Sequence, residues 1–376
     1  MTIYVQPDYA RDVPADDFRA NVLTRRIEEA LARQHLPGLT VAVVGPEGPV
    51  YAHAFGRASV RTGRLMTTRT VIPWFSLTKL VTATATVRLA ERGRLDLDAP
   101  VTDLLPELGR ITTAPMTARH LLSHTSGLPN PLPLRWVHVE GDSTFDEDAF
   151  VQAVFKRVRR VVRQPGTFVR YSNIGYLALG CLIARASGQP FETYVQQEIL
   201  SPLNMHDTAF HASRHAPRAT GHHRLPRALT PIMRAIFPPG VIAGHVGGYL
   251  DFAPFQVNGA AYGGLSGSVT DASRFARMHL AGGVLDGARI LSREATLEMR
   301  HLRAKGAKLN VGLGWFHASD SSSGDSSFVE HLGGGAGFWT LMRLYRDVEI
   351  AVVLMGNATR FDHDRIARLA HDVFGR

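Results

Sequence analysis

Ser76-Leu77-Thr78-Lys79 opens a run that continues without a charged residue from Leu80 to Val87. Its apolar residues fall on every side of a helix, which predicts a buried helix from Ser76 to Ala90. A lysine in the first turn is unfavourable there, because the helix dipole repels a cation and burial disfavours the charged amine. Residues three apart share a helical face, so the Lys79 amine can touch the Ser76 hydroxyl and activate it as a nucleophile.

Two further stretches follow this one along the chain. The first is Tyr171-Ser172-Asn173, and the second begins at His331-Leu332-Gly333-Gly334. A lone Ser-x-x-Lys motif is common by chance, but the three elements in this order resemble the serine β-lactamase and penicillin-binding-protein superfamily. Within it, the chain is most similar to the class C β-lactamase-like branch. That branch includes family VIII carboxylesterases, D-alanyl-D-alanine carboxypeptidases and D-aminopeptidases.

Three secondary signatures strengthen the resemblance. They are His120 to Pro129, Pro202 to Thr208, and Gly263 to Leu265. With them the resemblance extends over residues 20 to 375. Together the motifs are specific for the fold and the nucleophile and much less so for the substrate.

The resemblance implies roles for the residues of the first two motifs. Ser76 would form an acyl-enzyme, and Lys79 and Tyr171 would act together as general base and acid. Because nearby cations lower the pKa of a tyrosine, a Tyr171 phenolate is one candidate for the base and a neutral Lys79 is the other. Asn173 would orient Lys79 and the polar groups of the substrate. His120 and His124 are interpreted as structural residues that hold a loop beneath the site.

The third motif would complete an oxyanion hole. The backbone N–H groups of Ser76 and Gly334 would bind the developing oxyanion, and glycines 333–335 would let the strand approach the substrate closely. His331 stands where class C β-lactamases have a lysine. A histidine is a weaker and switchable cation at neutral pH. This difference disfavours β-lactam hydrolysis and weakens the case for a substrate with a free carboxylate at that position.

Short apolar, strand-like runs at both ends of the chain predict a single sheet built from both termini. The N-terminal hairpin comprises Leu39–Val44 and Val50–Phe55, and the C-terminal strands are Gly337–Tyr345 and Glu349–Met355. Amphipathic or short helices are predicted outside and between these strands, over residues 16–34, 118–123, 145–162, 173–187, 191–200 and 364–374.

These patterns and the resemblance predict an α/β (α+β) fold of the β-lactamase and penicillin-binding-protein type, with helices flanking an antiparallel sheet. We expect a discontinuous sheet domain over residues 1–92 and 243–376. A mainly helical domain over residues 93–242 would be inserted in it, with the active site at the interface. Residues 211–262 leave three alternatives open: a flap over a substrate pocket, a partner-binding loop, or ordinary core.

The composition is that of a globular protein, with 45% hydrophobic and 20% charged residues among 376 and a net charge of +9. The densest basic run, Lys156 to Arg163, alternates with valines and lacks interleaved aromatic residues, so we interpret it as a solvated helix face and not as a nucleic-acid site. No apolar run approaches the roughly 20 residues that span a bilayer. Met1 to Val22 lacks an apolar signal-peptide core, so we expect a cytoplasmic protein. The single cysteine, Cys181, excludes an internal disulfide.

We therefore expect a serine hydrolase that cleaves esters of small or medium acyl groups. A D-amino-acid peptidase or carboxypeptidase, or a weak β-lactamase, would use the same site, and a non-catalytic penicillin-binding scaffold is a more remote alternative. The expected partners are small-molecule esters, amides or D-peptides, with neither nucleic acid nor membrane, and the oligomeric state is open. No cofactor or metal is expected, because four histidines near the middle of the chain lack the spacing of a zinc site: His211, His215, His222 and His223.

Overall fold

The computed structural model describes residues 18–112, 114–142, 144–211, 216–318 and 328–375. An eight-stranded antiparallel sheet lies at its centre, in the order β12-β13-β14-β15-β16-β17-β1-β2. Its long strands come from the two ends of the chain: β1 (Gly38–Val44), β2 (Pro49–Gly56), β15 (Phe328–Gly335), β16 (Phe338–Tyr345) and β17 (Ile350–Gly356). The three short strands are β12 (Ala304–Lys305), β13 (Asn310–Val311) and β14 (Phe316–His317). The predicted sheet, with β1 and β17 side by side, is confirmed.

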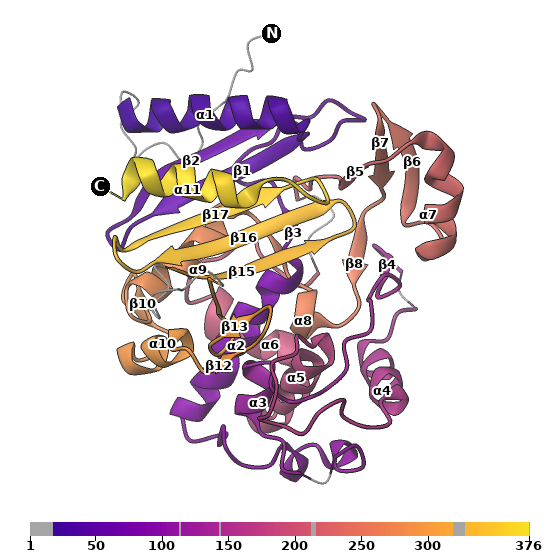
Figure 1. The fold of residues 1–376 in the computed structure, drawn as a ribbon, viewed down its shortest axis with the longest axis vertical. Helices are drawn as coiled ribbons and strands as arrows, with labels where there is room; N and C mark the ends of the chain where they lie inside the picture. The colour runs from indigo at the N-terminus through magenta and orange to yellow at the C-terminus, as the bar shows by residue number, and fades with distance from the viewer. Residues whose placement is uncertain (1–17, 113, 143, 212–215, 319–327, 376) are drawn as a thin grey trace.

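Helices cover both faces of this sheet (Figure 1). Helices α1 (Phe18–Gln34) and α11 (His363–Phe374) pack together on one face, over a core that includes Ile27 and Ile366. The other face carries α9 (Val269–Leu280). β1 is buried along its whole length, because both faces of its sheet are covered.

A helical region lies beyond α9 (Figure 1). Its central pair is α2 (Thr78–Glu91) and α5 (Asn173–Ser187), which pack against each other. Almost every residue of α2 is buried, as its uncharged run from Leu80 to Val87 predicts. Around this pair lie α3 (Ala118–Leu122), α4 (Glu147–Arg157), α6 (Phe191–Val195) with the π-helical turn Gln196–Leu200, α8 (Ala260–Gly263) and α10 (Arg293–Arg300).

Small sheets and single turns complete the described chain. The paired short strands are β3 (Ile72–Pro73) with β9 (Ser266–Gly267), β4 (Val137–Val139) with β8 (Phe255–Val257), and β10 (Val284–Leu285) with β11 (Ala288–Arg289). A three-stranded sheet has the order β5 (His222–Arg224), β7 (Tyr249–Phe252), β6 (Ile242–Val246). The 3-10 turns are Phe75–Leu77, Val101–Asp103, Pro106–Leu108 and Arg227–Leu229, and the last of these leads into α7 (Thr230–Ile236).

The predicted helix over residues 145–162 is too long. α4 ends at Arg157, and Val158 is already extended and buried. Beyond it the backbone donates to other segments, from Val161 to the carbonyl of Ile111 and from Val162 to the carbonyl of Gly127. These tertiary hydrogen bonds replace the next helical turn, so Arg159, Arg160 and Arg163 do not lie on a helix face.

The three-stranded sheet crosses the predicted domain boundary. The boundary between residues 242 and 243 falls inside β6, and β5 on one side of it pairs with β7 on the other. The division into two domains stays a prediction. In the same region Val241 and Leu250 are buried as ordinary core, whereas Ile232 on α7 is 55% exposed.

Within the described ranges, no helix is both long and apolar enough to cross a membrane. The N-terminal segment on which the expectation of a cytoplasmic location depends falls largely in residues 1–17, outside the described residues. That location stays a prediction.

Candidate active site

Ser76 lies in the 3-10 turn that precedes α2. The residue before it, Phe75, has φ of +48°, a left-handed conformation that is strained for a bulky side chain. Its ring packs near the rings of Phe255 and Phe338, with centroids 6.1 and 6.5 Å away. Gly335 faces the same ring so closely that an added Cβ would lie 2.7 Å from it. This packing holds the strained turn that presents Ser76.

Lys79 is fully buried next to the Ser76 hydroxyl. Its Nζ lies 3.1 Å from Ser76 Oγ and 2.8 Å from the carbonyl oxygen of Tyr262. Burial lowers the pKa of Lys79 well below the ordinary lysine value. The amine is therefore held towards its neutral form, as the opening motif predicts, and its lone pair is free to take a proton.

Three tyrosine rings surround this amine. The Nζ of Lys79 lies 4.9 Å from the ring centroids of Tyr171 and Tyr262 and 5.4 Å from that of Tyr176. Such rings attract a cation through their negative faces. They can stabilise the ammonium form when Lys79 gains a proton. Sequence reasoning missed Tyr262, although it directly precedes the signature at Gly263.

The Tyr171 hydroxyl donates a hydrogen bond of 2.6 Å to Ser76 Oγ. Burial raises the pKa of Tyr171, so the hydroxyl keeps its proton. The proposed phenolate is therefore wrong for the free protein. Its physical basis is missing, because the neighbouring amine that was to lower this pKa is itself held neutral by burial.

Asn173 begins α5 but does not cap it. The cap is Ser172, whose side chain accepts from the backbone N–H of Gly175. The Asn173 N–H donates to Asn130 Oδ1 at 3.0 Å, and its own Oδ1 is buried without a hydrogen-bond partner among the described residues. The expected contact with Lys79 is not made, because that amine donates to Tyr262. An unpaired buried oxygen is costly unless a ligand group reaches it.

Strand β15 packs tightly against the turn that carries Ser76. A Cβ on Gly333 would lie only 2.2 Å from the carbonyl oxygen of Trp74. Thr340, on the neighbouring strand β16, donates to the same carbonyl at 3.1 Å. Only glycine permits this approach, which brings the strand of Gly334 to the Ser76 turn. The role of Gly334 in an oxyanion hole stays a prediction.

His331 is completely buried on β15. Its Nδ1 lies 2.8 Å from the carbonyl oxygen of Leu332, and its ring stacks on Phe316 with centroids 4.2 Å apart. Burial, and next the charge of Lys79 when protonated, lower the pKa of His331 to about 3. The expectation of a switchable cation is therefore wrong: near neutrality this imidazole is uncharged.

His124 packs against Tyr171. It is buried in a left-handed conformation with φ of +54°. The backbone N–H of Ser172 donates to its Nδ1 at 3.2 Å, and its ring lies 4.5 Å from the ring of Tyr171. These contacts agree with the predicted structural role of the loop from His120 to Pro129.

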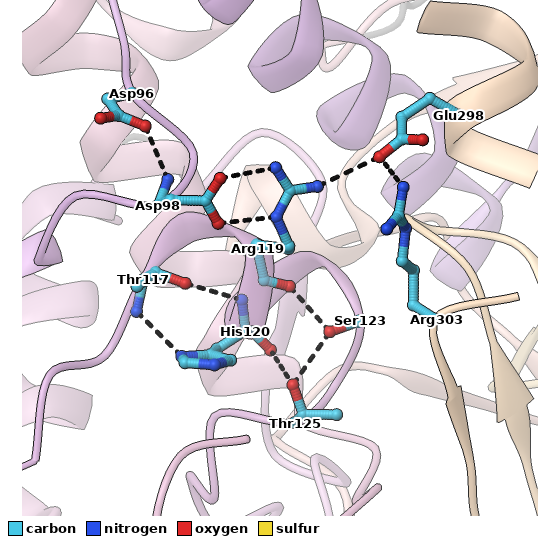
Figure 2. Close-up of polar contacts among 9 residues, drawn as sticks. All are labelled: Asp96, Asp98, Thr117, Arg119, His120, Ser123, Thr125, Glu298 and Arg303. Carbon is cyan, nitrogen blue, oxygen red and sulfur yellow. Dashed lines mark hydrogen bonds and ion pairs between the residues drawn. The ribbon is translucent and has the colours of Figure 1, made fainter. Parts of the chain in front are cut away.

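Figure 2 shows how the base of that loop is fixed. His120 and Thr117 form a reciprocal cap at the start of α3, and the Ser123 hydroxyl donates to the Arg119 carbonyl at 2.7 Å. The Arg119 guanidinium binds both carboxylate oxygens of Asp98 at 2.7 Å. These contacts fix the position of the residues that directly precede His124.

Among the described residues, the histidines near the middle of the chain do not form a metal site. His211 lies 3.0 Å from Glu192, whereas His222 lies 3.4 Å from Asp251. Within the described ranges, no three His, Cys, Asp or Glu side chains are placed to hold a metal ion. His215 lies outside those ranges.

Known proteins are similar to this chain over half of its length or more. The family model described as Beta-lactamase matches residues 23–374. Penicillin-binding protein 4* of Bacillus subtilis (strain 168) is 25% identical over 353 residues, which cover 93% of this chain and 75% of that protein. Esterase EstB of Burkholderia gladioli is 33% identical over 212 residues, 52% of this chain and 53% of EstB. The crystal structure of SurE with D-Leu is 26% identical, covers 94% of this chain and 74% of that one, and has a TM-score of 0.70.

Proposed function

This chain belongs to the beta-lactamase family of serine hydrolases, and from that membership we propose that it cleaves esters of small or medium acyl groups through an acyl-enzyme on Ser76. The observation that carries the proposal is the position of the Ser76 oxygen. It lies between a buried amine held towards neutrality, Lys79, and a phenol that keeps its proton, Tyr171.

In acylation, Ser76 donates its proton to Lys79 as its oxygen bonds to the ester carbonyl carbon. Tyr171 hydrogen-bonds to the same oxygen and lowers the cost of its developing charge. The carbonyl oxygen becomes an oxyanion, which the N–H groups of Ser76 and Gly334 bind in this proposal. When the ester C–O bond breaks, the departing alkoxide takes a proton from Tyr171, and the Lys79 ammonium restores that proton.

In deacylation, the same groups act again, with water as the nucleophile. Water adds to the acyl carbon and gives a proton to the Lys79–Tyr171 pair, and the bond to Ser76 then breaks. Ser76 recovers a proton from that pair, and the carboxylic acid leaves. The unpaired Oδ1 of Asn173 is available to accept a hydrogen bond from substrate.

His331 favours esters over β-lactams. A β-lactam carries a carboxylate close to the bond that breaks, and an uncharged imidazole offers it no ion pair. A neutral ester needs no cation at this position. The similarity to EstB over half of the chain also supports an ester as the substrate.

A D-amino-acid peptidase or carboxypeptidase is the second candidate. Two comparisons favour it: penicillin-binding protein 4* aligns over 93% of this chain, and SurE is a structural neighbour that was crystallised with D-Leu. The acyl-enzyme steps would be the same, with an amine as the leaving group. A scaffold without turnover is the remote third candidate, and the intact set of Ser76, Lys79, Tyr171 and Asn173 argues against it.

The decisive experiment compares p-nitrophenyl butyrate hydrolysis by the wild type and by Ser76→Ala. We expect clear turnover that the substitution abolishes, and equal rates would refute the proposal. Release of D-alanine from D-alanyl-D-alanine peptides and hydrolysis of nitrocefin, measured on the same sample, separate the second candidate from the first. Labelling of Ser76 by a fluorophosphonate, located by mass spectrometry and followed by turnover, removes the scaffold.

A further inference from the structure

A cavity of about 930 Å³ lies beside the segment that carries Tyr171. This volume lies within the roughly 300–1,000 Å³ of small-molecule sites. Its walls come from the loop of residues 129–136, from the end of α4 with the irregular run after it, and from two residues near Tyr171, namely Arg170 and Ile174.

The cavity adjoins the proposed site on two sides. On one side, its wall residue Asn130 accepts the backbone N–H of Asn173. On the other, the ring of Trp136 lies 5.6 Å from the ring of Tyr262. The carbonyl of Tyr262 in turn binds Lys79. A ligand in the cavity would therefore lie next to a substrate at Ser76.

The lining carries four positive charges and none of the opposite sign. Arg157, Arg159, Arg160 and Arg170 line it, and no lining residue is acidic. Elsewhere in the described chain, arginines such as Arg88 and Arg185 form ion pairs with glutamates. No ion pair with a carboxylate is formed by the four lining arginines among the described residues. An anion is the ligand that such a set of guanidinium groups would bind.

Apart from Asn130, the rest of the lining is apolar. It includes Trp136, Val154, Val158 and Ile174. The same two wall segments also expose Leu132 and Val162, which are 76% and 46% accessible. An apolar body with an acidic group fits this combination. A single nucleic-acid strand fits it less well, because Trp136 alone among the lining residues is aromatic, so successive bases would have no row of rings to stack on.

We propose that this cavity binds an acidic group carried on an apolar part of the substrate, so that the preferred ester is an amphipathic anion bearing a carboxylate or phosphate. The inference rests on the proposed ester hydrolysis at Ser76. It places the acidic group among the arginines and away from His331, so it does not require a cation on β15. It also gives the run from Arg157 to Arg160 a function in substrate choice.

The test uses two pairs of esters that differ in one charge. Mono-4-nitrophenyl adipate and its methyl ester carry or lack the anion on the acyl half. The butyrate esters of 4-hydroxybenzoate and of methyl 4-hydroxybenzoate carry or lack it on the leaving half. The measured quantity is the ratio of kcat/KM for the charged ester to that for the neutral one, so the two pairs identify the half that enters the cavity.

The variant is Arg159→Gln with Arg160→Gln, and the matched control is Arg163→Gln. Arg163 is an exposed arginine of the same segment that does not line the cavity. We expect the ratio to fall about fivefold or more in the double variant in at least one pair, as the loss of two charge contacts implies. The ratio in Arg163→Gln stays at the wild-type value. In the wild type the ratio falls as salt is added, since exposed charges are screened.

Unchanged ratios in both pairs, with hydrolysis still dependent on Ser76, would overturn this inference and leave the proposed function intact. A calorimetric titration with suberate measures the affinity of the cavity for an anion and requires no turnover. We expect weaker suberate binding by the double variant than by Arg163→Gln. Equal affinities would overturn the inference even if no ester proves to be a substrate.

Discussion

The Tyr171 hydroxyl donates to Ser76 Oγ across 2.6 Å, although the two residues are 95 positions apart in the chain. The donor comes from the segment just before α5 and the acceptor from the turn before α2, two helices that pack against each other. The geometry of the nucleophile therefore depends on this helix pair.

The pH dependence of hydrolysis should report the buried amine. Protonated Lys79 cannot take the Ser76 proton, so kcat/KM for p-nitrophenyl butyrate should rise with pH through the lowered pKa of Lys79, well below 10.5. It should then stay level above the pKa of Lys79, because the raised pKa of Tyr171 keeps its phenol protonated. Because the folded amine binds a proton less readily than the unfolded one, the free energy of unfolding should also rise with pH up to the ordinary lysine pKa. A rate that rises only near pH 10 would contradict this assignment.

Tyr171→Phe should remove the proton donor and keep the ring that packs on His124. We expect kcat/KM to fall by about 10²–10⁴, the usual contribution of general acid–base catalysis, with little change in Tm. Tyr176→Phe is the matched control, because that hydroxyl donates to the Leu122 carbonyl and not to Ser76. We expect this control variant to have a lower Tm and a kcat/KM close to that of the wild type. Equal losses of activity in the two variants would argue against Tyr171 as the acid.

His331→Lys should shift the substrate preference towards β-lactams. A charge-assisted hydrogen bond contributes about 1.5–3 kcal/mol, so the ratio of nitrocefin to p-nitrophenyl butyrate turnover should rise about tenfold or more. His331→Gln also removes the imidazole but adds no charge, and it should leave the ratio unchanged. If both variants behave alike, the charge at this position does not control the preference.

Gly333→Ala should separate β15 from the Ser76 turn. Its Cβ would lie 2.2 Å from the Trp74 carbonyl oxygen, and overpacking of this kind costs about 1–3 kcal/mol. We expect a lower Tm and a large loss of kcat/KM. Gly48→Ala, where an added Cβ meets nothing within 4 Å, should change neither. Wild-type activity in Gly333→Ala would show that the strand need not approach so closely.

Local patterns were sufficient to predict much of this molecule. The uncharged run after Lys79 predicted a buried helix and a neutral amine, and the apolar strand-like runs near both ends predicted the strands of one sheet. The surroundings of His331 could not be predicted, because its neutrality results from complete burial against Phe316, which is fixed only in the fold. The same holds for the end of α4 at Arg157, where the hydrogen bonds of Val161 and Val162 to distant carbonyls outweigh a helical sequence pattern.

The packing of α1 on α11 also brings the two ends of the described chain together. The Arg19 guanidinium lies 5.7 Å from the ring centroid of Phe374, on the sheet face opposite the core that contains Phe75 and Leu77. A short linker between these helices could close the chain into a ring, and new ends could then be opened in an exposed loop elsewhere. A tether attached at this corner would leave the catalytic face turned away from the support, which suits the protein to immobilisation.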